Sequence, residues 1–218
     1  GALIEGELYT NETISDGGYY TKYNSDLSTA PKCWISESQR YKHQHQTIVD
    51  GLSHSCNYFF YELGDRLGET RLYQYAANFG FTSKTGIDLP GEVRSVVGCQ
   101  TSLYDPDKAM DEASQDTSMP IIVFNSIKKH LRNQGASRNI TYDDERLNRC
   151  VKRLMDMAVN TNQADWVQSM RPILMEELNM TREMVHLQVV IGDTYNYLND
   201  IKWGGSQTIQ VAIGQSIT

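Results

Sequence analysis

The chain has 218 residues, a formal net charge of −7 and an ordinary apolar content of 39%. This length supports one large domain or two small ones with a substantial core. An acidic chain without a strongly basic block is poorly suited to nucleic acid, so we expect no nucleic-acid partner. No apolar run is long enough to cross a bilayer, and the sequence shows no signal peptide.

Residues 9–46 are rich in small polar residues and glycine, which is typical of irregular loops. We expect at most one short hairpin, around Gly17-Gly18-Tyr19-Tyr20. Cys33, His43 and His45 could be imagined as metal ligands, but their spacing does not match a structural zinc site. We interpret them as part of a polar surface loop and expect neither a metal nor a cofactor. No C-x-x-C pair occurs, so we expect free or partly paired thiols.

Residues 47–78 are predicted to be helical. The apolar residues that recur there at helical spacing are Ile48, Leu52, Phe59 and Leu63. Ser55-Cys56-Asn57 interrupts this pattern, and Ser and Asn favour helix ends because their side chains compete for backbone hydrogen bonds. We therefore expect one helix to end near His54 and a second to start at about Asn57. The interruption is either an N-cap or a hydroxyl and an amide held side by side at a pocket.

The second of these helices should continue to about residue 78. Leu72, Ala76 and Phe79 form one apolar stripe, and Gly80 is placed to end the helix as its C′ residue. Residues 81–92 then form a connection punctuated by glycine and proline.

Residues 105–200 are charged, rich in methionine and helical in period. Thr141-Tyr-Asp-Asp144 resembles a helix-start box, Asn179 is a plausible stop, and Thr181 can cap a further helix that runs through Leu198. We predict three to five helices whose apolar stripes bury against each other. The two clearest stripes are Leu147, Val151, Leu154 and Ala158, and Trp166, Met170, Leu174 and Leu178.

Several segments in order resemble one known family. Ser55-Cys56-Asn57-Tyr58-Phe59 is similar to the second motif, S-x-N, of penicillin-binding protein transpeptidases. The order of the other similar segments makes the resemblance specific, whereas S-x-N alone would be weak. These segments are Gly1–Gly6, Tyr61–Gly64, Tyr75-Ala76, Phe79–Phe81, Gly86–Glu92 and Ala212–Gln215.

The resemblance implies a mainly α chain: part of the β-lactamase-like α/β transpeptidase fold with an all-α inserted subdomain. Residues 1–98 would be the helical part of the transpeptidase domain that carries the S-x-N motif. Residues 99–202 would be a helical insertion like that of some Gram-positive, clostridia-like members, and residues 203–218 would return to the transpeptidase core.

The family cross-links peptidoglycan by acyl transfer from a D-Ala-D-Ala stem peptide through a serine ester. By resemblance, Ser55 would relay a proton between the catalytic lysine and the leaving amine, and Asn57 would hold the substrate amide and help to fix that lysine. Stem peptides and β-lactams would be the partners of the intact parent. The parent would lie on the extracytoplasmic face of the bacterial membrane, held by an anchor outside this chain.

Two family motifs have no convincing counterpart here. The S-x-x-K that carries the nucleophile is expected just before the first residue, and Ser126-Ile-Lys-Lys129 looks like a solvated helix face. Lys84-Thr85-Gly86 is followed by Ile-Asp-Leu-Pro, so we interpret it as a coincidence with the K-T-G strand motif. We therefore expect this fragment alone to be inactive.

Two other functions compete with this one. The first is a non-catalytic helical interaction module that docks cell-wall or division proteins, which an exposed apolar patch on residues 105–200 would favour. The second makes Cys56 a thiol nucleophile beside His54, but residues two apart on a helix do not face each other.

Overall fold

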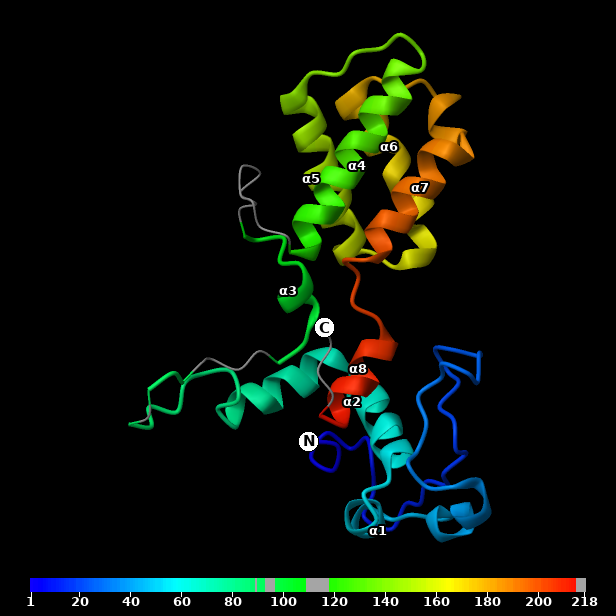
Figure 1. The fold of residues 1–218 in the computed structure, drawn as a ribbon, viewed down its shortest axis with the longest axis vertical. Coiled ribbons are helices and arrows are strands. Elements are labelled where there is room, and N and C mark those ends of the chain that lie inside the picture. The colour runs from blue at the N-terminus through cyan, green and yellow to red at the C-terminus, as the bar shows by residue number, and fades with distance from the viewer. Residues whose placement is uncertain (89, 93–96, 109–117, 215–218) are drawn as a thin grey trace. The chain divides into compact units, whose positions relative to one another are not determined.

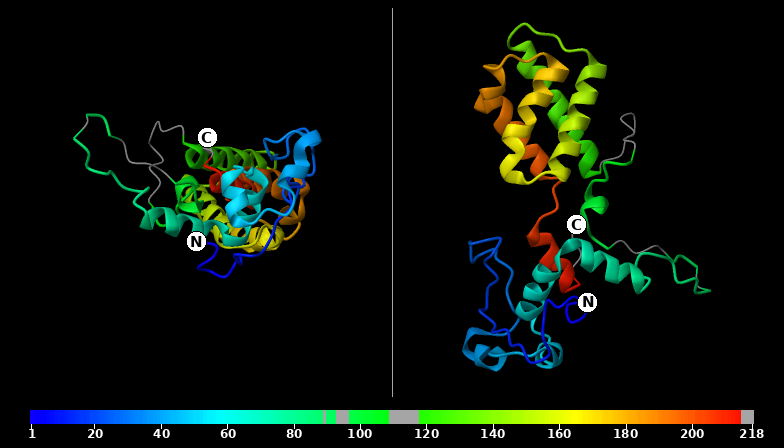
Figure 2. Two further views of the ribbon diagram at one scale, coloured as in Figure 1. Left: turned by 90° about the horizontal axis from the view of Figure 1, so that it is seen from below. Right: turned by 180° about the vertical axis from the view of Figure 1, so that it is seen from behind.

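A computed structural model describes residues 1–88, 90–92, 97–108 and 118–214, which form two compact units. The first unit combines residues 1–102 with the C-terminal segment from residue 204, and the second comprises residues 103–203. Within the described residues the chain is mainly helical (Figures 1 and 2), as expected. The strand-like pairing among them is limited to two isolated bridges, Ile14 with Gln46 and Tyr19 with Lys32.

The N-terminal loop of the first unit is organised by long-range pairing. Gly18 and Tyr20 pair with residues 31–33, through Cys33 N to Gly18 O (2.9 Å) and Tyr20 N to Pro31 O (2.7 Å). The short hairpin predicted around Gly17–Tyr20 does not turn at these residues: Tyr19 pairs antiparallel with Lys32. Asp16 Oδ1 accepts the Gly18 N–H at 2.6 Å, and the pairing partner lies more than ten residues away. A 3-10 helix, η1 (Glu37–His43), follows.

Two helices meet at the interruption that the sequence predicts. Helix α1 (Ile48–Ser53) begins with a capping box between Thr47 and Asp50 and ends at the C-cap His54, and α2 (Asn57–Asn78) follows. Both predicted boundaries are confirmed. Helix α2 bends at Gly68, whose φ of 72° and ψ of 167° are not helical.

The C-terminal end of α2 matches the prediction in its stop but not in its whole stripe. Gly80 follows the C-cap Phe79 and has a φ of 84°, a left-handed conformation that suits glycine. Leu72 and Ala76 are half-buried, whereas Phe79 is exposed. Leu52 of α1 is also exposed, so these two predicted core positions are wrong. Both residues lie within a few positions of the end of their helix. The last turn of each helix directs these side chains away from the elements that cover the rest of the apolar face.

Helix α8 (Gly205–Ala212) packs against α2 within the first unit (Figure 1). A Cβ on Gly64 would lie 2.3 Å from the Cβ of Ala212, so only glycine permits this approach. The contact joins the C-terminal segment to the first half of the chain. The main core of the unit consists of Ala2, Leu8, Ile14, Cys33, Ile35, Cys56, Phe59, Leu63 and Leu67.

The second unit contains four longer helices among its described residues, in agreement with the predicted three to five. These are α4 (Met119–Ala136), α5 (Asp144–Asn160), α6 (Trp166–Leu178) and α7 (Gln188–Asn199). The short elements η2 (Gln163–Asp165) and η3 (Met184–His186) lie between them, and α3 (Gln100–Leu103) lies at the sequence boundary of the two units. Both predicted stripes are buried in one shared core.

The ends of these helices test the predicted capping residues. Asn179 ends α6 in the left-handed conformation (φ 53°), as predicted. Helix α5 is capped by Asp143, which accepts the Arg146 N–H at 3.1 Å, and not by Thr141. Thr181 does not cap α7: its hydroxyl accepts the N–H of Met184, the first residue of η3, at 3.3 Å, and α7 begins only after the extended Leu187. None of the described helices is long and apolar enough to span a membrane.

Candidate active site

The candidate site is the turn of residues 54–57 between α1 and α2, which we call the S-x-N turn. Ser55 has a φ of 49°, which is uncommon for a residue with a side chain. Cys56 is fully buried, whereas Ser55 is exposed and Asn57 is half-buried. The turn therefore directs the middle side chain into the protein and leaves the two flanking ones accessible.

Neither flanking residue is used as a helix cap. The N-cap position of α2 is Cys56, without a side-chain capping bond, and Asn57 is the first helical residue. Among the described residues we find no hydrogen-bond partner for the Ser55 hydroxyl or the Asn57 amide. The N-cap interpretation is thus the weaker of the two that the sequence left open.

Trp34 holds the turn from the outside. Its indole Nε1 donates to the carbonyl oxygens of Ser55 (3.0 Å) and His54 (3.2 Å). The His54 ring in turn lies against Gln46, with 2.7 Å between Nδ1 and Oε1. The loop of residues 9–46 thus holds His54 and Ser55 in place.

Four metal-ligand-type side chains meet beneath the turn, namely Asp16, Cys33, His43 and Cys56, and we call them the four-donor cluster. All four are buried, with exposed fractions of 4% or less. Their donor atoms all lie within 4.8 Å of one another. The predicted polar surface position is therefore wrong for Cys33 and His43, and it is right for His45, which is exposed.

The two thiols of the cluster share a hydrogen bond, at a distance of 4.0 Å between the sulfurs. This bond lowers the pKa of the Cys33 thiol to about 6, assisted by the backbone N–H groups of Ile35 and Tyr58. The same bond, together with burial, raises the pKa of Cys56 above its usual range. Cys33 is therefore the more acidic thiol of the pair. A buried thiol at Cys56 with a raised pKa is unsuited to nucleophilic attack, which argues against the cysteine mechanism.

The other motif-like strings lie in unsuitable places. Ser126 and Lys129 belong to the middle of α4 in the second unit, where Ser126 is half-buried and Lys129 is exposed. Thr85 and Gly86 lie in a loop, and their N–H groups donate to the carboxylate of Glu92 at 2.5 and 3.1 Å. No described residue of Lys84-Thr85-Gly86 is in a strand, in line with its interpretation as a coincidence.

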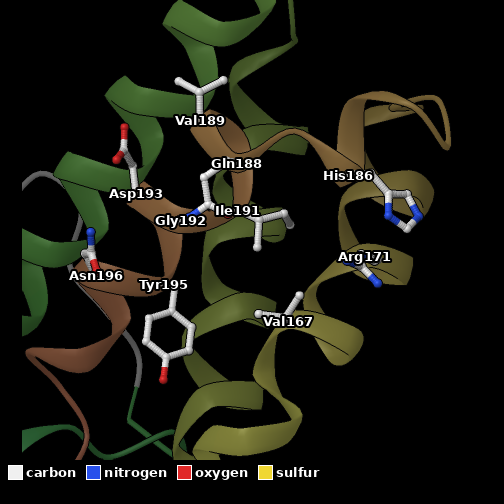
Figure 3. A pocket seen from close by; sticks show the side chains of 10 residues that line it. All are labelled: Val167, Arg171, His186, Gln188, Val189, Ile191, Gly192, Asp193, Tyr195 and Asn196. Carbon is white, nitrogen blue, oxygen red and sulfur yellow. The ribbon is translucent and has the colours of Figure 1, made fainter.

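The second unit contains a hollow of about 550 Å³. Figure 3 shows that its lining side chains come from α6, η3 and α7. Arg171 Nε donates to the carbonyl oxygen of Val185 at 3.3 Å, so its guanidinium is partly engaged. Serine and cysteine are absent from the lining, and acyl transfer needs a nucleophile of that kind. We therefore do not assign the chemistry to this hollow.

A comparison with protein families places residues 1–113, just over half of the chain, in the penicillin-binding protein transpeptidase domain. The chain belongs to this family. The matched residues of this transpeptidase-family chain include the whole S-x-N turn and the four-donor cluster.

Two curated relatives support the assignment. Stage V sporulation protein D of Bacillus subtilis is 43% identical over 75 residues, which cover 34% of this chain and 11% of the relative. Peptidoglycan D,D-transpeptidase MrdA of Acinetobacter baumannii is 32% identical over 92 residues, 42% of this chain and 13% of the relative. The matches thus span only about a tenth of the length of these relatives. No solved structure matched this transpeptidase-family chain.

Proposed function

We propose that the first unit is the S-x-N-bearing part of a D,D-transpeptidase that cross-links peptidoglycan stem peptides by serine acyl transfer. The observation that carries this proposal is the S-x-N turn, which leaves a hydroxyl and a carboxamide accessible and unpaired while its backbone is held by Trp34. A functional site that binds substrate needs such polar groups on a rigid support.

The proposed roles follow from the chemistry of acyl transfer. A serine nucleophile attacks the carbonyl carbon of the penultimate D-alanine, and the terminal D-alanine leaves as an amine that needs a proton. Ser55 can both accept and donate a hydrogen bond, so it would pass a proton between the catalytic lysine and the leaving amine. Asn57 offers an acceptor and two donors, which suit the substrate amide and the same lysine.

The domain organisation that we propose keeps the boundaries predicted from the sequence. Residues 1–98 carry the S-x-N motif, residues 99–202 form an all-α subdomain inserted in the transpeptidase domain, and residues 203–218 return to its core. The packing of α8 against α2, with Gly64 at the contact, supports the return segment.

We further propose that this chain alone is inactive. The nucleophilic serine is expected in an S-x-x-K motif, and the S-x-N turn does not supply that serine. In the parent protein, β-lactams would acylate that serine, and an anchor outside this chain would hold the domain at the extracytoplasmic face of the membrane.

The alternative of a helical interaction module receives less support. It requires an exposed apolar face on the second unit, whereas the two predicted stripes there are buried against each other. The remaining exposed apolar side chains of this unit include Ile122 and Val189, and single residues of this kind are normal at a protein surface.

The proposal is tested on a longer protein that contains this chain and the expected S-x-x-K and K-T-G motifs. We expect it to release D-alanine from a peptide that ends in D-Ala-D-Ala. Ser55→Ala should lower the rate by about 10²–10⁴-fold, the usual contribution of a proton-transfer group. Ser53→Ala, an exposed serine at the end of α1, is the control. Equal rates for the two variants would contradict the proposal.

A further inference from the structure

We infer that Asp16, Cys33, His43 and Cys56 form a closed binding site for a divalent transition-metal ion, with Zn²⁺ as the best fit. The inference rests on the geometry and burial of these four residues, and it stands apart from the proposed transpeptidase function. Neither the two helix boundaries at the turn nor the family match requires a metal here.

The distances between the donor atoms fit tetrahedral coordination. Cys33 Sγ lies 4.0 Å from Cys56 Sγ and 3.5 Å from His43 Nδ1. Asp16 Oδ2 lies 3.1 Å from His43 Nδ1 and 3.6 Å from Cys56 Sγ. Zinc binds sulfur at about 2.3 Å and nitrogen or oxygen at about 2.0–2.2 Å, which gives tetrahedral edges of about 3.3–3.8 Å. These four distances are close to tetrahedral edges, and all the donor atoms lie within 4.8 Å of one another.

The chemistry of the donors favours zinc among the divalent ions. Two thiolates and an imidazole are ligands of zinc and of similar first-row metals, whereas Ca²⁺ and Mg²⁺ prefer oxygen ligands alone. Exposed fractions of 0–4% leave no open coordination position for water. Closed four-ligand sites of this kind are structural, while catalytic zinc sites keep one position free.

The surroundings orient the carboxylate toward the centre of the cluster. The Gly18 N–H donates to Oδ1 of Asp16 at 2.6 Å, so Oδ2 is the oxygen that faces His43 and Cys56. Without a cation the buried Asp16 carboxylate has, besides this bond, a ring nitrogen and a thiol as partners. Buried carboxylates are costly unless paired or bound to metal, so a divalent ion explains why an acid is buried beside two cysteines.

The metal would also explain how the N-terminal loop keeps its shape. Asp16, Cys33 and His43 come from residues 9–46, where the strand-like pairing among described residues is limited to isolated bridges. Cys56 comes from the S-x-N turn itself, between Ser55 and Asn57. One ion would tie three points of the loop to the turn and hold the two accessible side chains in place.

A disulfide between Cys33 and Cys56 is the main alternative. The sulfurs are 4.0 Å apart, well beyond the bonded distance of about 2.05 Å. A disulfide would also leave Asp16 and His43 buried with no role. It differs from the metal site in a simple observable, because it would not bind zinc.

The test uses the 218-residue chain, purified under reducing conditions, loaded with Zn²⁺ and dialysed against metal-free buffer. We expect elemental analysis to find about one zinc ion per chain. Cys33→Ser should weaken zinc binding by more than the roughly 10–100-fold that second-shell substitutions cost. Cys99→Ser, at another buried free cysteine outside the cluster, is the matched control and should retain the metal.

A second measurement covers the case in which Cys33→Ser does not fold. Co²⁺ is added in place of Zn²⁺ to the unmodified chain, and the absorption spectrum is recorded. We expect the intense visible bands of tetrahedral Co²⁺ and a thiolate-to-cobalt charge-transfer band. A weak octahedral spectrum without that band would overturn the inference. Where Cys33→Ser does fold, equal zinc retention by this variant and the unmodified chain would overturn it as well.

Discussion

At the scale of single residues, the S-x-N turn combines one buried and two accessible side chains in three consecutive positions. A left-handed backbone at Ser55 costs free energy for a residue other than glycine. The cost is borne because Cys56 is fixed in the core and Trp34 binds the carbonyl groups on the other side. Backbone strain of this kind is common at functional sites.

Trp34→Phe should loosen the turn without unfolding the protein, because the indole is 63% exposed and the ring is largely preserved. The loss of its hydrogen bonds is worth about 1 kcal/mol, which corresponds to about fivefold slower acylation of the longer protein by a β-lactam. The thermal midpoint should fall by no more than about 2–4 °C. Tyr41→Phe, also exposed in the same loop, is the control, and an equal loss in both variants would refute this role of Trp34.

At the scale of elements, ion pairs join α5 to α6 in the second unit. Arg153 of α5 binds Glu176 and Glu177 of α6, each at 2.8 Å. Arg149 adds a longer contact to Glu177 at 3.5 Å. The hydrogen bond from Arg153 holds the pKa of Glu177 below its ordinary value of 4.5. The carboxylate therefore stabilises the folded state wherever it is ionised.

Glu177→Gln should lower the free energy of unfolding at neutral pH by about 0.5–1 kcal/mol, the upper range for partly exposed ion pairs. Because the folded pKa is lowered, this contribution is complete above pH 4.5 and is lost as the pH falls through the folded value. Denaturant titrations of the two proteins should thus converge in acid. Glu145→Gln, at an exposed i,i+4 pair with Arg149, should show a smaller loss; a pH-independent difference would contradict the assignment.

The sequence predicted elements where one local rule decides the outcome. Helical periodicity identified the buried faces of α5 and α6. Asn179 identified the end of α6 and Gly80 the end of α2, because a left-handed cap depends only on local backbone conformation. Thr141 failed because Asp143, two residues later, is an equally good cap. Phe79 failed because burial depends on what else packs nearby.

From the sequence, Cys33 and His43 were considered as metal ligands but set aside, and the complete four-donor cluster was not found. Its members are separated by loops of irregular length, so no spacing rule for zinc applies. The available signal was physical: a loop-rich segment of this length needs a cross-link to stay ordered. Ser55, Cys56 and Asn57 were found because they interrupt a helical pattern, while nothing in the sequence singled out Asp16.

At the scale of the molecule, the chain forms two compact units, and the family match lies mainly in the first. We expect the 218-residue chain to form no covalent adduct with a labelled β-lactam. In the proposed mechanism Ser55 of the S-x-N turn transfers a proton and is not the serine that becomes acylated. Intact-mass spectrometry after incubation is the measurement. A stoichiometric adduct would contradict this prediction and would direct attention to Ser126.

The most direct test of the central claim is the second-order rate constant for acylation of the longer protein by a fluorescent penicillin. If the S-x-N turn supports acyl transfer, Ser55→Ala and Asn57→Ala should each lower this constant by about 100-fold or more, while Ser53→Ala leaves it unchanged. Acylation of the Ser55→Ala and Asn57→Ala variants at the unmodified rate would show that the turn has no part in the chemistry.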